Sequence, residues 1–182
     1  MTDAPSIRRA RVQDASAIAE IYRPHVEGGT ASFEQIAPTA DDIAARMADA
    51  GDAYPWIVAE RDDRVAGYSY AGAHRSRYGY RWSVDTAIYV AGTSVGEGVG
   101  RSLYGALLGI LTRQNFAMAF AGITLPNDAS RGLHRTMGFE PVARYPCVGY
   151  KDGVWMDTEW WARPLAERTV PPKDILPVPS DL

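Results

Sequence analysis

The stretch from Arg81 to Leu111 restricts the fold more than any other part of the sequence. Apolar and polar residues alternate from Arg81 to Val90, which is the period of a β-strand and places Asp85 and Tyr89 on one face. A glycine-rich loop follows, and apolar residues then recur at helical spacing. We therefore expect a strand, a tight loop and a long helix in direct succession. The helical stripe consists of Val99, Leu103, Ala106, Leu107, Ile110 and Leu111.

The loop Gly96-Glu97-Gly98-Val99-Gly100 has the composition of an anion-binding turn. Glycines let the backbone curl so that several N–H groups point to one spot, and the N-terminus of the next helix adds about half a positive charge. A pyrophosphate suits such a site. A P-loop would need Gly-Lys-Ser/Thr where Arg101-Ser102 stands, and a dinucleotide fingerprint would need the spacing G-x-G-x-x-G. A glycine-rich turn without a ligand is the alternative on these residues alone.

The other apolar patterns predict further strands and helices on both sides of this stretch. The order is then β-α-α-β-β-β-α-β-α-β-β. It predicts an α+β fold with a mixed, mostly antiparallel sheet of about seven strands, flanked by helices, and excludes a doubly wound parallel sheet. The expected strands lie at 7–12, 56–60, 65–72, 81–90, 117–125, 139–149 and 154–163, and the helices begin near Asp14, Thr39, Val99 and Asn127.

The composition is that of one globular domain. Of 182 residues, 46% are apolar and 23% are charged, and the formal net charge is −3, which does not indicate binding to nucleic acids or membrane surfaces. A single cysteine, Cys147, allows no internal disulfide and fits a reducing cytoplasm. No apolar run reaches the roughly 18 residues of a membrane span. We expect a cytoplasmic protein with a domain over 1–165 and a proline-rich tail over 166–182.

A second motif lies downstream, from Asn127 to Phe139. It reads Asn-Asp-Ala-Ser-Arg-Gly-Leu-His-Arg-Thr-Met-Gly-Phe. This resembles the pattern Asn-x-x-Ala/Ser-x-x-x-Tyr-x-x-x-Gly-Phe of the GCN5-related N-acetyltransferases, the GNAT superfamily, with His134 where many members carry a tyrosine. In that superfamily a loop of the form Gln/Arg-x-x-Gly-x-Gly/Ala holds the pyrophosphate of coenzyme A. Within it the chain resembles the phosphinothricin N-acetyltransferases over about residues 7–165, most clearly at 54–60, 66–72, 125–128 and 149–157.

The resemblance implies a GNAT fold with acetyl-CoA as the co-substrate. The strand segment at 88–90 would pair with the pantetheine arm and offer a backbone N–H to the thioester oxygen. The resemblance also implies a homodimer whose partners are acetyl-CoA and a small amine. The residues that it assigns to the co-substrate are Ile88, Tyr89, Val90, Gly96, Glu97, Gly98, Val99, Gly100, Arg101 and Asn127.

Two departures from the family pattern matter, one in the glycine loop and one at the proposed catalytic position. Val95 replaces the Gln/Arg that opens the pyrophosphate motif, and Glu97 adds a negative charge beside the phosphates. Backbone N–H donors survive any change of side chain, so we expect acetyl-CoA to bind with reduced affinity. The proposed catalytic glutamate of the subfamily corresponds to Asp85, whose side chain is one methylene shorter.

The same resemblance makes Asp85 and His134 the candidates for catalysis. Asp85 would accept the amine proton through water, and His134 would share this role or protonate the leaving thiolate, because imidazole titrates near neutral pH. The alternatives are a carboxylate that anchors a turn or an arginine, and a histidine that is a satisfied core residue. His25 and His74 have no partners at metal-ligand spacing, so we expect no metal.

Phe33, Arg77 and Tyr80 are the residues that the resemblance assigns to the substrate. Arg77 would hold the carboxylate of an amino acid, a task that suits the guanidinium fork, and the alternative is a solvated basic patch. The implied reaction is direct transfer, in a ternary complex, to the α-amino group of phosphinothricin, methionine sulfoximine, methionine sulfone or a similar compound. Acetylation of an aminoglycoside, a polyamine or a peptide N-terminus is one alternative, and a non-catalytic acyl-CoA-binding protein is another.

Overall fold

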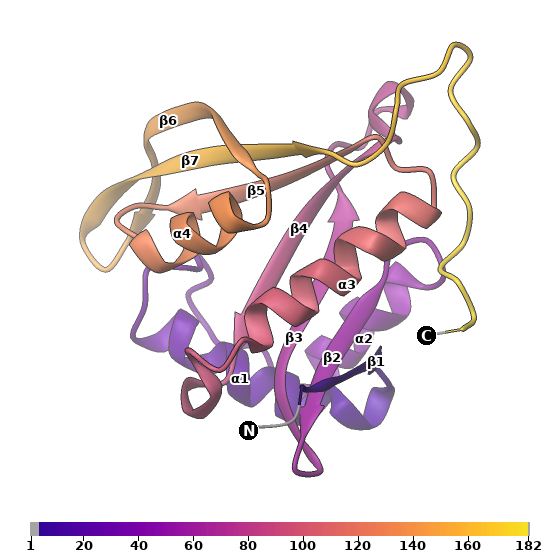
Figure 1. The fold of residues 1–182 in the computed structure, drawn as a ribbon. Coiled ribbons are helices and arrows are strands. Elements are labelled where there is room, and N and C mark those ends of the chain that lie inside the picture. The colour runs from indigo at the N-terminus through magenta and orange to yellow at the C-terminus, as the bar shows by residue number, and fades with distance from the viewer. Residues whose placement is uncertain (1–3, 182) are drawn as a thin grey trace.

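The computed structural model describes residues 4–181, which form one seven-stranded sheet with helices on both faces (Figure 1). The strand order is β1-β2-β3-β4-β5-β7-β6, and every neighbouring pair is antiparallel except β4 with β5. The mixed, mostly antiparallel α+β fold predicted from the sequence is therefore confirmed. The strands are β1 Ser6–Arg9, β2 Trp56–Arg61, β3 Arg64–Ala73, β4 Ser83–Val90, β5 Met118–Thr124, β6 Glu140–Lys151 and β7 Val154–Pro164.

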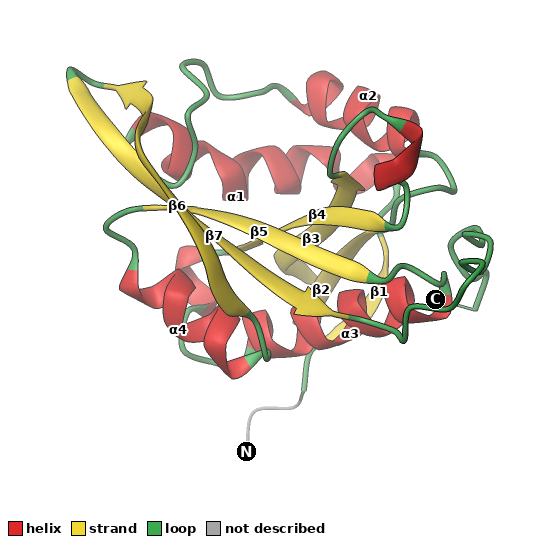
Figure 2. Cartoon of the chain, turned by 90° about the horizontal axis from the view of Figure 1, so that it is seen from above, coloured by secondary structure: helices red, strands yellow, loops and turns green. Residues whose placement is uncertain are grey.

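The helices lie in two layers, with α1 and α2 on one face of the sheet and α3 and α4 on the other (Figure 2). Each layer covers its own apolar core. Because β2 is covered on both faces, Ile57 points into the core under α3 while Trp56 and Val58 point into the core under α1 and α2. The helices are α1 Ala15–Glu27, α2 Ala40–Ala50, α3 Val99–Arg113 and α4 Asp128–Thr136.

Local sequence explains where α2 and α4 begin. The Thr39 side chain accepts a hydrogen bond from the backbone N–H of Asp42, and the Asp42 carboxylate accepts one from the backbone N–H of Thr39. The side chain of Asn127 accepts from the backbone N–H of Ser130 at 3.0 Å and starts α4. Gly138, with φ of +79°, supplies the left-handed turn after α4. These caps fix the position of α4 directly after β5.

The parallel strands β4 and β5 separate after three residue pairs. Residues Ser83–Asp85 lie opposite Met118–Phe120. Beyond this point β5 continues alongside β7, and β4 keeps β3 as its one strand neighbour among residues 4–181. The backbone of β4 from Thr86 onward therefore has an unpaired edge that faces the gap between the two strands.

The element boundaries differ from the expected ones where a short 3-10 turn intervenes. β1 ends at Arg9 because the turn Val12–Asp14 leads into α1. β4 begins at Ser83 because Tyr78–Tyr80 form another such turn. No helix of residues 4–181 has the length and apolar character needed to cross a membrane.

The segment 166–181 contains no helix or strand and runs along the domain, drawn in yellow in Figure 1. Val178 is buried in the core beside α3 and donates its backbone N–H to the carbonyl of Asp52 at 2.8 Å. The Gln114 side chain donates to the carbonyls of Ala53 and Leu176. The tail therefore packs on the domain, and the division of the chain at residue 165 stays a prediction.

Candidate active site

A cavity of about 70 Å³ lies in the fork between β4 and β5. β4 lines it with Thr86–Tyr89, and β5 lines it with Ala121–Thr124. The cap and first turns of α4 contribute Asn127, Ser130 and His134. Because the edge of β4 is unpaired here, its backbone N–H and C=O groups can bind an extended chain that contains amides.

At the far end of β4 the chain turns through the glycine loop into α3. Gly96 and Gly98 have φ of +86° and +81°, a conformation that residues with a side chain rarely adopt. No side chain within residues 4–181 caps the N-terminus of α3, so the N–H groups of its first turn remain available to an anion. Val95, at the position of the Gln/Arg in the motif, is 70% exposed. The loop thus has the backbone geometry that suits an anion, and its binding role stays a prediction.

Glu97 forms an ion pair with Arg61, the last residue of β2. The Arg61 side chain is largely buried, at 15% exposure. We expected the Glu97 charge to weaken phosphate binding, but the structure provides a positive partner for it. The pair reduces the repulsion that Glu97 would exert on a phosphate.

His134 is buried on the α4 wall of the cavity. Its Nδ1 donates to the carbonyl of Ser130 at 2.8 Å, and its Nε2 lies 3.0 Å from the Tyr104 hydroxyl. That hydroxyl is also 2.7 Å from Oγ1 of Thr86, which donates to the carbonyl of Phe120. Burial lowers the pKa of His134, so the imidazole is neutral at neutral pH and Nε2 accepts from Tyr104. The Tyr104 proton then goes to His134, so Oγ1 of Thr86 divides its one proton between the Tyr104 oxygen and the Phe120 carbonyl, and these contacts join α4, α3, β4 and β5.

Asp85 lies where the fork begins, two residues before the cavity-lining Ala87 on the same face of β4. Its Oδ1 is 2.6 Å from Nδ1 of His74, the first residue after β3. Burial raises the pKa of Asp85, while the hydrogen bond with His74 and the charge of Arg75 oppose this rise. The His74 ring stacks on Phe120 at a centroid distance of 4.3 Å. A partly buried carboxylate–imidazole pair therefore stands where β4 and β5 begin to diverge, next to the strand positions that line the cavity.

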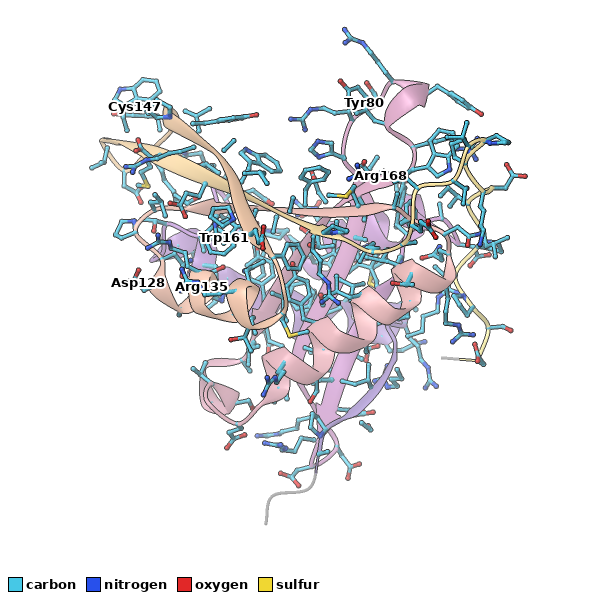
Figure 3. All side chains as sticks on the ribbon, turned by 45° about the horizontal axis from the view of Figure 1, so that its top comes forward. Tyr80, Asp128, Arg135, Cys147, Trp161 and Arg168 are labelled. Atoms are coloured by element: carbon cyan, nitrogen blue, oxygen red, sulfur yellow. The ribbon has the colours of Figure 1, made fainter. Side chains whose placement is uncertain are left out.

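Aromatic and basic side chains surround this pair. Tyr80 and Trp160 each present an edge to the His74 ring, at centroid distances of 6.2 Å and 5.8 Å. The guanidinium group of Arg75 lies over the Trp160 ring at 5.7 Å. Figure 3 shows Tyr80 on its turn beyond the start of β4, well away from Asp128 at the start of α4. Aromatic faces and a guanidinium group suit a small ligand that carries an anionic group.

Comparisons with known proteins decide the family. A family model described as an acetyltransferase (GNAT) domain matches residues 7–160. The chain belongs to the GNAT acetyltransferase family. The phosphinothricin N-acetyltransferase of Alcaligenes faecalis is 39% identical over 162 residues, which are 88% of this chain and 82% of that protein. The L-amino acid N-acyltransferase MnaT of Escherichia coli is 38% identical over 167 residues, or 91% of this chain and 97% of that protein. The resemblance inferred from the motifs, and the N-acetyltransferase class with it, are confirmed.

Solved GNAT structures share the fold. A GNAT superfamily phosphinothricin acetyltransferase from Sinorhizobium meliloti, in complex with AcCoA, matches with a TM-score of 0.88 and 35% identity, over 98% of this chain and 97% of that one. The yncA structure from Salmonella typhimurium, with its cofactor acetyl-CoA, matches with a TM-score of 0.88 and 33% identity, over 92% of this chain and 97% of that one. Relatives of this GNAT chain thus bind acetyl-CoA on the same fold.

Several of the predicted GNAT site residues meet at the cavity. Ile88, Tyr89 and Asn127 line it together with His134. A Cβ added to Gly100 would lie 3.5 Å from the side chain of Val90, so the start of α3 approaches β4 closely. Their roles in binding the co-substrate stay predictions.

Other predicted residues lie outside the cavity lining. Val99 is buried in the core under α3, and Arg101 is exposed in the first turn of that helix. Arg77 is exposed just before the 3-10 turn that carries Tyr80, and it takes part in no ion pair within residues 4–181. The Phe33 ring fills the space beside Gly149, where an added Cβ would overlap it. Phe33 therefore packs under the β6–β7 hairpin.

Lys151 forms hydrogen bonds to the end of α1 and to the loop that contains Phe33. Its buried ammonium group donates to the carbonyls of Val26, Gly29 and Ser32 at 2.5, 2.9 and 2.8 Å. All three N–H donors of the ammonium group are used, and the C-terminal end of α1 is tied to the hairpin. This loop also supplies Ala31 to the cavity wall, so Lys151 holds one wall in place.

Sequence reasoning missed His74 as part of the site. The hairpin register indicates it, since β3 and β4 pair Gly72 with Asp85 and Ala73 with Val84, so that His74 follows the strand end beside Asp85. The expectation considered His74 only as a metal ligand. No cluster of three or more His, Cys, Asp or Glu side chains that could hold a metal occurs among the described residues.

Proposed function

We propose that the protein transfers the acetyl group of acetyl-CoA to the α-amino group of a small amino-acid-like compound, such as phosphinothricin, methionine sulfoximine or methionine sulfone. One observation carries the proposal. The fork cavity runs beside the middle of β4, with the pair of Asp85 and His74 near the start of that strand and the uncapped start of α3 after its end. Relatives named as phosphinothricin or methionine sulfoximine acetyltransferases support this class of acceptor.

The residues present fit acetyl-CoA. The pyrophosphate would lie against the N–H groups of residues 96–101, where Gly96 and Gly98 take up left-handed backbone conformations. The pantetheine arm would pair with the unpaired edge at Ile88–Val90. A backbone N–H of that edge would polarise the thioester carbonyl. Acetyl-CoA supplies the activated acyl group, and direct transfer needs the two reactants held side by side in a ternary complex.

Two groups would handle the protons. Asp85, together with the His74 that bonds it, would take the proton of the amine. His134 lines the opposite wall, and its imidazole would take up a proton at Nε2 before it returns one to the leaving thiolate. This assignment gives each wall of the cavity one task in the transfer.

The basic loop after β3 would hold the acidic end of the substrate. Arg77 is the predicted carboxylate partner, and Arg75 offers a second guanidinium group beside Trp160. Tyr80 and Phe33 would supply apolar walls. Arg75→Gln and Arg77→Gln, compared through KM for the amino acid, identify the arginine that carries the contact. Substitution of the arginine that contacts the substrate should raise that KM about 10-fold or more, because a charge-assisted hydrogen bond is lost.

The test is the rate of thiol release from acetyl-CoA with a panel of acceptors. Phosphinothricin, methionine sulfoximine, methionine sulfone, common amino acids, an aminoglycoside, a polyamine and a short peptide would be compared. Fast release with the first three supports the proposal. Release with the polyamine or aminoglycoside alone contradicts the acceptor class, and acetyl-CoA binding without release on any acceptor contradicts catalysis.

We also propose a cytoplasmic homodimer. The edge strand β6 and its partner β7 expose apolar side chains that a second copy of the chain would cover. Sedimentation equilibrium tests this, and a concentration-independent monomer contradicts it. An exposed single cysteine, Cys147 at the outer end of β6 (Figure 3), fits a reducing compartment. The exposed apolar residues of this face are Val142, Tyr145, Val148, Tyr150, Val154 and Trp155.

A further inference from the structure

We propose that His74 is the general base of the reaction and that Asp85 positions it. The inference rests on the proposed acetyl transfer and names the atom that takes the amine proton, Nε2 of His74. It differs from the expectation drawn from family resemblance, in which the carboxylate at position 85 takes the proton through water.

The shorter side chain of Asp85 is already committed to His74. Oδ1 of Asp85 lies 2.6 Å from Nδ1 of the imidazole, within the range of a strong charge-assisted hydrogen bond. The carboxylate accepts, so Nδ1 carries the proton and Nε2 is left with its lone pair. Among the hydrogen bonds of residues 4–181, none uses Nε2 of His74. The pair therefore offers Nε2 of His74 as the proton acceptor.

The position of the ring matches that task. His74 stacks on Phe120, which lies opposite Asp85 at the last residue pair before the strands diverge. Ala87 and Gly122 line the cavity. Each lies two residues beyond Asp85 or Phe120 on the same face of its strand, a rise of about 7 Å. The imidazole thus stands at the apex of the fork, against the side chains of Asp85 and Phe120, which share a sheet face with the cavity-lining Ala87 and Gly122.

Neighbouring side chains hold the ring in one orientation. Phe120 stacks on one face, and the edges of Tyr80 and Trp160 approach from other sides. The His74 side chain is 13% exposed, so it lies mostly out of water while the site stays accessible. A base fixed by packing and by one oriented carboxylate is preorganised for proton transfer.

The charges around His74 suit a group that gains a proton during turnover. The ionised carboxylate of Asp85 stabilises the imidazolium that forms, as the third member of a catalytic triad does. Arg75 is the opposing charge, and its guanidinium donates to the carbonyl of His74 at 2.7 Å. Tyr80, Phe120 and Trp160 add no formal charge. The single carboxylate in direct contact is therefore the group that favours the imidazolium.

The proton balance of the step is complete. The substrate ammonium gives its first proton to Nε2 of His74, and the neutral amine attacks the thioester carbonyl carbon. The C–N bond forms, the C–S bond breaks, and the nitrogen loses its second proton as the amide forms. One of the two protons leaves on the thiol of CoA and the other passes from His74 to solvent. No oxidant or reductant takes part.

Two substitutions at position 74 test the assignment. His74→Phe keeps a ring on Phe120 and removes both nitrogens, and His74→Gln keeps a polar group. We expect both to lower kcat by about 10²–10⁴-fold with unchanged affinity for CoA measured by calorimetry. The dependence of log kcat/KM on pH should differ between the wild type and both variants, because the variants lack the group that takes the amine proton. The control Tyr78→Phe changes an exposed side chain of the same loop and should keep wild-type activity.

A double variant tests the pairing. Because Asp85 acts through His74, Asp85→Asn should lower kcat, and Asp85→Asn with His74→Gln should be no slower than His74→Gln alone. Wild-type kcat and pH profile in both position-74 variants would overturn the assignment, as would losses that multiply in the double variant.

Nitrogen NMR gives a readout independent of turnover. With histidine labelled in the ring and His74→Phe used for assignment, we expect the neutral tautomer protonated at Nδ1. The tautomer protonated at Nε2 would overturn the inference. If the wild type is inactive but His74 is protonated at Nδ1, the proposed acetyl transfer is contradicted, whereas the hydrogen bond between Asp85 and His74 is supported.

Discussion

Two regions next to the fork cavity are built differently: the glycine loop at the start of α3, called the α3 end, and the pair of Asp85 and His74 where β4 meets β5, called the β5 end. At the α3 end, the left-handed glycines Gly96 and Gly98, the uncapped helix start and the unpaired edge of β4 offer backbone N–H groups. At the β5 end, the chemistry depends on side chains, above all Asp85 and His74. A backbone-built site tolerates side-chain changes such as Val95, whereas a side-chain site changes its chemistry with each substitution. We therefore expect variants at the β5 end to lower kcat and variants at the α3 end to change affinity for acetyl-CoA.

The largest effect should come from Asp85→Ala. Loss of the carboxylate leaves His74, the proposed base, without its orienting partner, and we expect kcat to fall by up to about 10²–10⁴-fold, the usual contribution of the base that Asp85 positions. KM for acetyl-CoA should stay the same. Thiol release under saturating substrates measures this, with Asp49→Ala as a control, because Asp49 is an exposed carboxylate on α2. An unchanged kcat with a raised KM for acetyl-CoA would contradict the assignment of turnover to the β5 end and of acetyl-CoA affinity to the α3 end.

His134→Gln should have the next largest effect on turnover. The change breaks the hydrogen bond between His134 and Tyr104 and removes the proposed proton donor for the thiolate. We expect kcat to fall by about 10²-fold, at the lower limit for acid–base catalysis, since water can replace part of the donor's role. Tyr104→Phe, which leaves the imidazole in place, should cost less. Equal and full activity in both variants would show that the His134 wall is structural.

Gly98→Ala should act on co-substrate affinity alone. At φ of +81° a Cβ costs about 1–2 kcal/mol, which corresponds to about 10-fold in an equilibrium constant. KM for acetyl-CoA should rise by about that factor with kcat nearly unchanged. The control Gly109→Ala adds a Cβ inside α3, where nothing lies within 4 Å, and should be neutral or stabilising. A fall in kcat without a change in KM would place this loop in the chemical step.

Arg61→Gln should weaken CoA binding by a smaller factor. It leaves the Glu97 carboxylate unpaired beside the proposed pyrophosphate site, and a partly exposed charge pair contributes up to about 1 kcal/mol, or about 5-fold. Adding Glu97→Gln to this variant should restore the affinity. Calorimetric titration with CoA measures both, with a thermal melt to check folding. Affinity that stays low in the double variant would mean that Arg61 contributes in another way.

The smallest effect concerns stability and pH. Burial lowers the pKa of His134 in the folded protein, whereas the unfolded chain has the ordinary histidine value of about 6.5. Protonation therefore favours unfolding. The stabilisation is present above about pH 6.5 and is lost as the pH falls through the folded-state pKa. Denaturant titrations should show a steeper decline in unfolding free energy below that pH for the wild type than for His134→Gln. Parallel curves would contradict the burial of a neutral imidazole.

The sequence predicts those parts of the fold that depend on local patterns. The cap at Thr39, the cap at Asn127 and the alternation before Val90 each act over a few residues, so their elements lie where expected. The glycine loop is also local, because left-handed backbone needs only the glycines at 96 and 98. These patterns, with the family motifs, account for the seven strands and the acetyltransferase class.

The contacts at the β5 end depend on which distant segments meet. His74 reaches Asp85 because β3 and β4 form a hairpin, and its ring finds Phe120 only because β5 pairs beside β4. The partner of Glu97 is Arg61, 36 residues earlier in the chain. Neither pairing can be predicted from the order of residues alone. In the sequence, the charge of Glu97 and the short side chain of Asp85 therefore appear unfavourable, and their partners become visible only in the folded sheet.

One measurement tests the central claim that the fork joins acetyl-CoA to an amino acid. The wild type would be incubated with acetyl-CoA and methionine sulfoximine, and thiol release and the N-acetyl product would be followed together by absorbance and mass spectrometry. The account predicts one N-acetylated amino acid for each CoA released, and a loss of both signals in Asp85→Ala. Tight binding of acetyl-CoA without any N-acetyl product, on this or the other amino-acid acceptors, would contradict it.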